Sequence, residues 1–156
     1  MAKPQPTAKL ASKPSAKPTP KAQAKSVAPT PIVLDSSCWM EFFADTDRAD
    51  LFASVIEAVD QLVVPVLTIY EVVKKLAREA GDETASAALS LMQRGQVAAI
   101  DLGLAVDAAV NGLPMADSLI YATARQHGAV LWTQDAHFEG LPGVKYFQKP
   151  AVQAKA

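Results

Sequence analysis

A short apolar run that ends on an acidic residue does most to limit how this chain can fold. Residues 32–34 read Ile-Val-Leu without polar alternation, and Asp35, Ser36 and Ser37 follow them. Such a run is typical of a strand that is buried on both faces, as in a parallel sheet. Asp35 is therefore predicted at the carboxyl edge of a sheet, where open α/β folds bind their ligands. The alternative is that Asp35 or one of the two serines only caps the helix that follows.

Strand-like and helix-like segments alternate along the rest of the chain. Apolar runs predict further strands at residues 62–64, 97–100, 129–132 and, at the edge, 144–147. Helical spacing of apolar residues predicts helices at residues 38–44, 47–60, 68–80, 83–94, 104–110 and 115–127. This alternation predicts an α/β fold, with a central parallel sheet of four to five strands and helices on both faces. Because crossovers in such sheets are right-handed, the carboxyl ends of the strands meet at one edge.

The first thirty residues differ sharply in composition from the rest of the chain. They hold six lysines and six prolines but no acidic or aromatic residue. Such a segment cannot bury enough apolar surface to offset the entropy lost on ordering, so residues 1–30 are predicted to form a disordered basic tail. All 16 acidic residues lie between Asp35 and Glu139, against eight Lys and Arg from Arg48 to Lys149, so a tail of +6 adjoins a body of −8. Residues 150–156 are predicted to be frayed.

Cysteine content and hydropathy give expectations about the compartment. The one cysteine, Cys38, lies among apolar residues, so we expect a buried free thiol, which fits a reducing compartment. The N-terminal segment lacks the apolar core of a secretory signal, and no apolar run approaches the length needed to span a membrane. These features predict a soluble, cytoplasmic protein that does not associate with membranes.

Four acidic residues are predicted to meet at the carboxyl edge of the sheet. They are Asp35 after the first strand, Glu71 in the first turn of the helix after the second, Asp117 in the first turn of the helix before the fourth, and Asp135 after the fourth. Each also has an ordinary explanation, since Thr68 and Glu71 match a capping box and acids favour helix starts. Four ionised carboxylates in one cleft would repel one another unless a cation binds them. Oxygen ligands favour a hard ion, Mg²⁺ or Mn²⁺.

The segments around these acids resemble the acidic motifs of PIN-domain ribonucleases, most of all the VapC-type toxins of toxin–antitoxin pairs. They read Val-Leu-Asp-Ser-Ser at 33–37, Ile-Tyr-Glu-Val-Val at 69–73, Ala-Asp-Ser-Leu-Ile-Tyr-Ala-Thr-Ala at 116–124 and Leu-Trp-Thr-Gln-Asp-Ala-His-Phe at 131–138. The resemblance spans residues 32–147 and implies a PIN-like α/β/α sandwich, a nuclease domain at residues 31–149. The basic tail lies outside it.

The resemblance implies an endoribonuclease that hydrolyses RNA phosphodiester bonds with Mg²⁺ or Mn²⁺. The residues that match the family's catalytic and metal-binding quartet are Asp35, Glu71, Asp117 and Asp135. Ser37 and Thr133 match its small hydroxyl positions, and such hydroxyls would orient the carboxylates or water around the metal. The alternative for these two residues is an ordinary role in a cap and a turn.

The resemblance also implies partners. A VapC-type toxin would form a homodimer and would have a cognate antitoxin that covers the acidic cleft. The helix carrying Trp39, Phe42 and Phe43 is a candidate for part of the antitoxin groove, although core packing is the simpler interpretation of these three side chains.

Basic residues are needed to hold RNA against an acidic body. Lys75 and Arg125 are candidates, because they follow Glu71 and Asp117 by four and eight residues on the same helices. An ordinary solvated surface is the alternative. The tail lysines could also hold phosphates, and they are Lys3, Lys9, Lys13, Lys17, Lys21 and Lys25. His127 and His137 are read as a helix-end residue and a loop residue without a chemical role.

Other functions on a similar fold fit the sequence less well. A receiver domain would need an acidic pair after the first strand, and a phosphatase of the haloacid-dehalogenase type would need Asp-x-Asp there, but position 37 is serine. A non-catalytic RNA-binding or scaffold module on the same fold stays open as the main alternative.

Overall fold

The structure is a computed structural model that describes residues 27–151. The six lysines of the predicted basic tail lie outside this range, as do the last five residues of the chain. The predictions of a disordered tail and of tail contacts to RNA therefore stay predictions.

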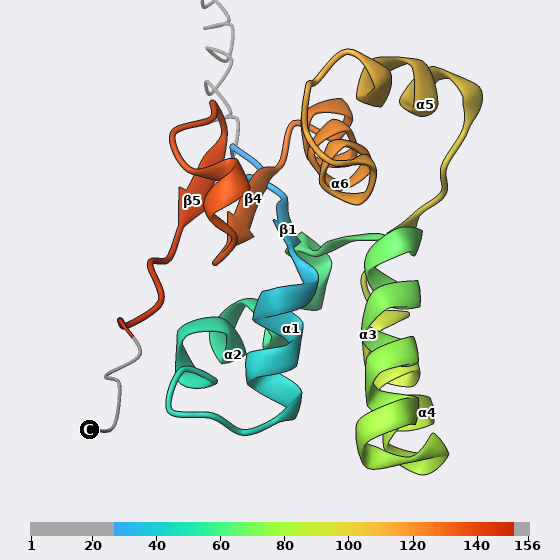
Figure 1. The fold of residues 1–156 in the computed structure, drawn as a ribbon, viewed down its shortest axis with the longest axis vertical. Helices are drawn as coiled ribbons and strands as arrows, with labels where there is room; N and C mark the ends of the chain where they lie inside the picture. Colours follow the sequence, from blue (N-terminus) through green and yellow to red (C-terminus); the bar gives the residue numbers. More distant parts are fainter. Residues whose placement is uncertain (1–26, 152–156) are drawn as a thin grey trace, which may run out of the picture.

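Strands and helices alternate through the described residues, as the sequence predicts (Figure 1). The strands are β1 Ile32–Leu34, β2 Val63–Pro65, β3 Gln96–Ala98, β4 Val130–Thr133 and β5 Val144–Tyr146. The helices are α1 Ser36–Phe43, α2 Asp50–Glu57, α3 Val66–Ala80, α4 Asp82–Met92, α5 Leu102–Ala109 and α6 Met115–Gln126, with 3₁₀ turns η1 Val59–Gln61 and η2 Ala136–Phe138.

All strand pairings are parallel, which confirms the predicted sheet type. β4 lies between β1 and β5 in a three-stranded sheet, and β2 pairs with β3 in a two-stranded one. A single parallel bridge between Ile32 and Leu62 joins the two sheets. The prediction of one continuous sheet is correct in its strands and directions, but β1 and the segment before β2 share only this one bridge, so the sheet divides into two ladders.

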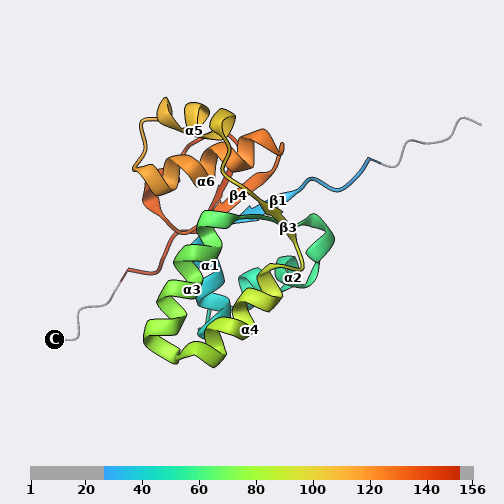
Figure 2. The same cartoon turned by 90° about the vertical axis from the view of Figure 1, so that its right-hand side faces the viewer.

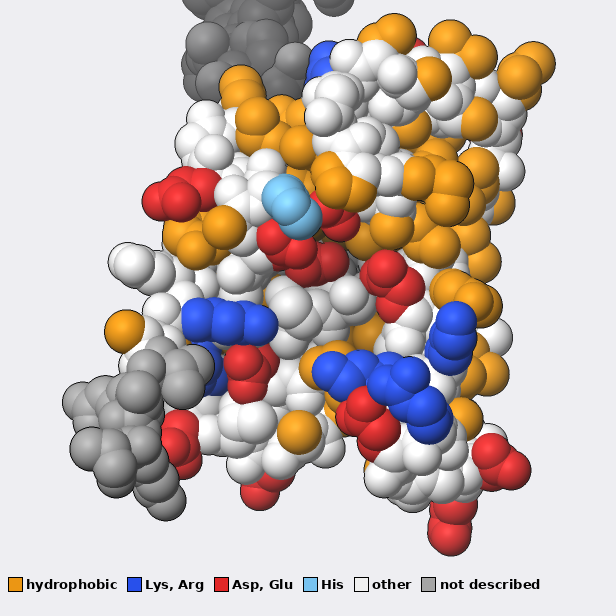
Figure 3. All heavy atoms as spheres, viewed as in Figure 1, with side chains coloured by type: hydrophobic (Ala, Val, Ile, Leu, Met, Phe, Trp, Pro, Cys, Tyr) orange, Lys and Arg blue, Asp and Glu red, His pale blue; other side chains and the backbone are white. Residues whose placement is uncertain are grey.

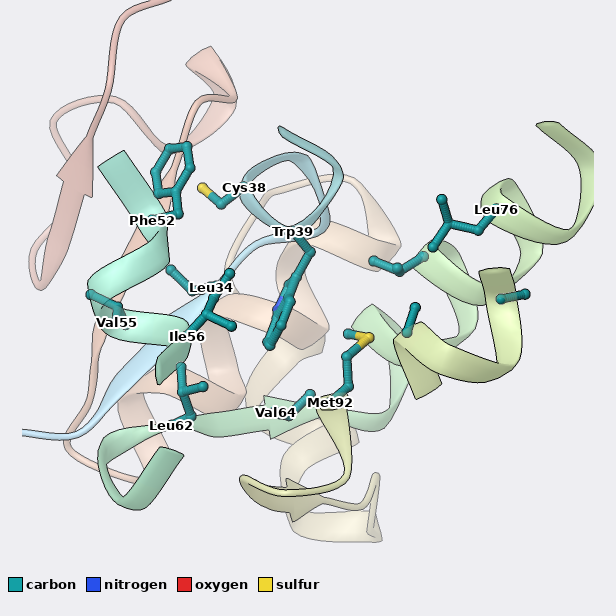
Figure 4. Close-up of a cluster of buried hydrophobic side chains, with 13 residues drawn as sticks. Leu34, Cys38, Trp39, Phe52, Val55, Ile56, Leu62, Val64, Leu76 and Met92 are labelled. Atoms are coloured by element: carbon teal, nitrogen blue, oxygen red, sulfur yellow. The ribbon is translucent and has the colours of Figure 1, made fainter. Parts of the chain in front are cut away.

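One face of the sheet is covered by α1 to α4. Leu34 and Val64 point to this side and belong to a buried cluster with Trp39 at its centre (Figure 4). Trp39 is fully buried and stacks on Phe43 at 5.8 Å between ring centroids. Core packing therefore explains Trp39, whereas Phe42 and Phe43 are only partly buried. A role for these two phenylalanines in an antitoxin groove stays a prediction.

The opposite face of the sheet is covered by α6, with α5 packed against that helix (Figure 2). Val33, Val63 and Leu131 point to this side and pack with Ile120 of α6 and with Phe138 of η2. Neighbouring residues in a strand thus enter different cores, which explains why these strands lack polar alternation. The helices on both faces confirm the α/β/α arrangement.

The helix that carries Glu71 starts earlier than its sequence indicates. α3 begins at Val66, directly after Pro65, so Thr68 lies inside the first turn and does not cap the helix. The Thr68 hydroxyl is buried without a hydrogen-bond partner among the described residues. The predicted capping box is therefore wrong, and Glu71 lies in the second turn. Glu71 is consequently not needed to satisfy a backbone amide at the helix start.

The predicted helix at residues 47–60 is also wrong in its extent. Residues 45–49 form turns instead, in which the Arg48 amide donates to the Thr46 hydroxyl at 3.2 Å. α2 therefore starts at Asp50, and the segment after Glu57 continues as η1. The third strand is likewise shorter than predicted, because Asp101 caps α5 by accepting the Leu104 amide at 2.8 Å.

Two further expectations concern the chain as a whole. Cys38 is buried and unbonded to another cysteine, as predicted. Among the described residues, no helix combines the length and the apolarity that crossing a membrane requires.

Close packing at the start of β3 yields a stability prediction. A Cβ atom on Gly95 would lie 3.0 Å from Val64 Cγ2 and 3.1 Å from the Leu62 carbonyl oxygen. We expect Gly95→Ala to lower the free energy of unfolding by about 1–3 kcal/mol through overpacking, as measured by urea denaturation. Gly103→Ala is the matched control, since its Cβ would contact only Asp101 Oδ1 at 3.4 Å and alanine favours a helix. Equal stability of the two variants would contradict this account of the β2–β3 packing.

Candidate active site

Asp35 is the most buried of the four predicted acids, with 5% of its surface exposed at the end of β1. Its Oδ1 accepts the amide of Ser36 at 2.8 Å. Its Oδ2 accepts the hydroxyls of Ser37 at 2.9 Å and Thr133 at 3.0 Å. Asp35 also occupies the N-cap position of α1, so the cap and the sheet-edge interpretations are both correct. Three donors from two elements thus fix one carboxylate.

Thr133 connects the two acids at the ends of β1 and β4. Its buried hydroxyl donates to Asp35 and accepts the amide of Asp135 at 2.9 Å. β1 and β4 are neighbours in the sheet, which brings the residues that follow them together. The sequence places Ser37 and Thr133 as candidate orienting groups, and the structure puts both hydroxyls on the Asp35 carboxylate.

The four predicted acids line one cleft of about 500 Å³. Asp35 lies at its base, Glu71 enters from α3, Asp117 from the first turn of α6, and Asp135 from the start of η2. Figure 3 shows acidic side chains gathered at the centre of this face, with Lys and Arg side chains on two sides of them. The structure therefore brings together the set that the sequence predicts at the sheet edge.

The electrostatics of the cleft disfavour four ionised carboxylates. Burial raises the pKa of Asp35, Glu71 and Asp117 above the usual range of each group. Repulsion between carboxylates raises these pKa values further. Asp135 raises the pKa of both Asp35 and Asp117, and Asp117 raises the pKa of Glu71. In Asp35 the donors from Ser37 and Thr133 act in the opposite direction and lower the pKa. The cleft thus has negative charge that the surrounding protein only partly compensates.

The donors in the cleft fit a divalent cation. Glu71 Oε2 is buried and has no hydrogen-bond partner among residues 27–151. A buried carboxylate oxygen without a partner is costly unless a cation approaches it. Carboxylate oxygens are the ligands that Mg²⁺ and Mn²⁺ favour.

His137 contacts two acids of the cleft, whereas the sequence predicts a plain loop residue. Its Nδ1 lies 3.0 Å from Asp117 Oδ2 and 3.1 Å from Asp135 Oδ1. These three residues also form a group that could hold a metal ion. The spacing Asp-x-His at residues 135–137 could have indicated this contact. In a 3₁₀ turn, the second residue after a capping Asp lies close to the carboxylate of that Asp. The His137 amide donates to Asp135 Oδ1 at 2.9 Å in this way.

The predicted RNA contacts divide into one that lines the cleft and one that does not. Lys75 lines the cleft with Glu71, as its position on α3 predicts. Arg125 lies elsewhere, with Nη1 3.4 Å from Asn111 Oδ1 and the guanidinium 5.8 Å from the Tyr121 ring centroid. Arg125 therefore does not line the cleft, because eight residues advance a helix by about 12 Å. Its role as an RNA contact stays a prediction.

Lys149 lines the cleft although no sequence signal indicated it. A buried glutamine, Gln134, connects the cleft wall to the segment that carries this lysine. Gln134 Nε2 donates to Glu41 Oε1 at 3.1 Å, and Arg48 Nε donates to Gln134 Oε1 at 2.6 Å. Arg48 Nη2 also donates to the carbonyl of Phe147 at 3.4 Å, which holds the chain two residues before Lys149.

The fold and the cleft together define a class of protein, a small parallel α/β domain with a cluster of acidic side chains at one edge of its sheet. The chain belongs to the PIN-domain family, whose sequence profile matches residues 32–144. A comparison with curated proteins found no match.

Solved structures with the same fold include proteins of toxin–antitoxin systems. A toxin–antitoxin complex from Klebsiella pneumoniae aligns at 23% identity over 73% of this chain and 95% of that chain, with a TM-score of 0.62. Mycobacterium tuberculosis VapC20, a toxin that cleaves the sarcin–ricin loop, aligns at 21% identity over 69% and 92%, with a TM-score of 0.57. VapBC2 from Rickettsia felis, bound to a promoter DNA fragment, aligns at 11% identity over 75% and 98%, with a TM-score of 0.60. Likeness at these identities shows the shared fold.

The raised pKa values predict how stability depends on pH when metal is removed. The folded chain binds more protons than the unfolded chain above the usual carboxyl range, so the free energy of unfolding falls as pH rises through the raised values. In a chelator we expect the melting temperature to fall as pH rises above the usual carboxyl range.

Glu71→Gln should flatten this dependence, because it removes one buried charge. Glu139→Gln, a change at an exposed acid outside the cleft, is the control and should leave the slope unchanged. A melting temperature in chelator that rises with pH above the usual carboxyl range, or a Glu71→Gln slope equal to that of the control, would contradict this view of the cleft.

Proposed function

We propose that this protein is a metal-dependent endoribonuclease that hydrolyses RNA phosphodiester bonds. The observation that carries the proposal is the convergence of Asp35, Glu71, Asp117 and Asp135 in one cleft, with a carboxylate oxygen of Glu71 left without a partner. Structural demands alone do not explain this set, because each buried acid destabilises the metal-free fold. Membership of the PIN-domain family supports the same chemistry.

The four acids would hold Mg²⁺ or Mn²⁺, with Asp35 the most firmly positioned of them. When bound, the ion activates water and stabilises the charge that develops on the phosphate. Ser37 and Thr133 keep the Asp35 carboxylate in one orientation by donating to the same oxygen, so its other oxygen keeps a free lone pair. Thr133 also fixes the backbone of Asp135, so the relative position of these two acids does not depend on the ion.

Two lysines on opposite elements are proposed to hold the RNA strand at the cleft. Lys75 comes from α3, and Lys149 comes from the segment after β5. Each can neutralise a phosphate, which an acidic cleft cannot do. The strand would then cross the carboxylates between these two lysines.

The same proposal extends to a biological role as the toxin of a type II toxin–antitoxin pair. The solved structures described above support it, since they include a toxin–antitoxin complex and an RNA-cleaving toxin. We propose a cognate antitoxin that covers the cleft, a homodimer, and a cytoplasmic location, where such a toxin meets its RNA. Growth arrest on expression that Asp117→Asn relieves would support the toxin role, and harmless expression of an active enzyme would contradict it.

The first prediction from this proposal concerns cleavage. We expect the purified chain to cut RNA with Mg²⁺ or Mn²⁺ and to stop when the metal is chelated. Asp117→Asn and Asp135→Asn should each lower the cleavage rate by about 100-fold or more, because each removes a metal ligand. Asp107→Asn is the control, since Asp107 is an exposed acid of α5 outside the cleft. Metal-independent cleavage, or full activity in both cleft variants, would contradict the proposal. RNA binding without any cleavage would favour the alternative of a non-catalytic RNA-binding or scaffold module.

The second prediction concerns the two lysines. In the Asp117→Asn background, where RNA stays intact, Lys75→Ala and Lys149→Ala should each weaken binding of single-stranded RNA. Each should also reduce the slope of log affinity against log salt by about 0.7. Lys74→Ala is the matched control, because Lys74 bonds Tyr70 at 3.0 Å and does not line the cleft. Equal losses in all three variants would show that binding follows net charge and not the position of the lysines.

A further inference from the structure

Among the described residues, His137 is the one histidine whose ring nitrogen lies with carboxylates of the cleft in a group that could hold a metal ion. Its Nδ1 lies within 3.0 Å of Asp117 Oδ2 and 3.1 Å of Asp135 Oδ1. A single ring nitrogen carries at most one hydrogen, so it cannot give a full hydrogen bond to both oxygens at once. The three atoms nevertheless converge, although 60% of the His137 side chain is exposed and free to turn toward solvent.

The turn that carries His137 is held at both ends. The amide of Asp135 donates to Thr133 Oγ1 at 2.9 Å, and the amide of His137 donates to Asp135 Oδ1 at 2.9 Å. The next residue, Phe138, is fully buried, and its amide donates to the carbonyl of Asp135 at 3.2 Å. The backbone of His137 is therefore fixed between a buried hydroxyl and a buried ring. The imidazole thus extends from a fixed backbone position beside the two acids.

The spacing of these atoms matches that of neighbouring ligands around a small divalent ion. In an octahedral site with bonds of about 2.1 Å, adjacent ligand atoms lie about 3.0 Å apart. The two nitrogen–oxygen distances at His137 are 3.0 and 3.1 Å. Little movement is thus needed for the nitrogen and one oxygen of each acid to become ligands of one ion.

We propose that His137 supplies a nitrogen ligand to the divalent ion held by Asp117 and Asp135. This inference rests on the proposed metal site but not on the cleavage of RNA. Imidazole binds Mg²⁺ poorly and binds transition ions well, so the nitrogen shifts the preference of the site from Mg²⁺ toward Mn²⁺. His137 then sets which metal the cleft prefers, a role that an all-carboxylate site lacks.

Metal-binding calorimetry on the full chain tests the preference. His137→Ala should weaken Mn²⁺ binding by tenfold or more and Mg²⁺ binding by much less, so the ratio of the two affinities falls. His127→Ala is the matched control, because the chain has two histidines and His127 lies at the opposite end of α6 from Asp117. Mn²⁺ binding that is unchanged or tighter in His137→Ala would overturn the proposal, since His137 would then only pair with the acids and compete with the ion.

Pulsed electron paramagnetic resonance gives a readout that does not depend on affinity. With Mn²⁺ bound at saturation, we expect the coupling of a directly coordinated ¹⁴N nucleus in the original chain and in His127→Ala, and its loss in His137→Ala. Absence of this coupling in the original chain would refute the nitrogen ligand even if RNA cleavage is observed. Conversely, a chain that fails to cut RNA but shows the ¹⁴N coupling would retain the metal site and lose only the proposed nuclease function.

Discussion

The buried carboxylate of Asp35 is the constraint on which the rest of the site depends. A carboxylate that is 5% exposed is stable only when donors surround it, and here Ser36, Ser37 and Thr133 supply three. These donors come from the start of α1 and the end of β4, so the carboxylate also ties together the elements on either side of β1. The start of the first helix, the β1–β4 pairing and the base of the cleft are therefore parts of one hydrogen-bonded unit.

The basic side chains that line the cleft do not pair with its four acids. Burial and mutual repulsion raise the pKa of Asp35, Glu71 and Asp117. These acids therefore lower the stability of the metal-free fold. The basic side chains lie at the rim, where Lys75 and Lys149 line the cleft without forming an ion pair with the four acids. In the proposed function, this separation would leave the centre of the cleft to a cation and the two lysines to phosphate groups.

Sequence patterns predicted the parts of the molecule that follow from strand direction. Asp35 was predictable because an apolar run that ends on an acid marks the edge of a parallel sheet. The failures depend on contacts distant in sequence or on local geometry. Thr68 lies inside α3 because the helix starts directly after a proline. His137 returns to Asp135 through a 3₁₀ turn, and Lys149 reaches the cleft through packing of the segment after β5.

We propose above that the acids at the carboxyl edge of the sheet form one metal site. Crystals grown with Mn²⁺, with diffraction recorded at the manganese absorption edge, test it most directly. We expect an anomalous peak inside the cleft, within coordination distance of Asp35 and at least one of Asp117 and Asp135. An ordered cleft without such a peak at saturating Mn²⁺, or a peak only at other sites on the molecule, would contradict it.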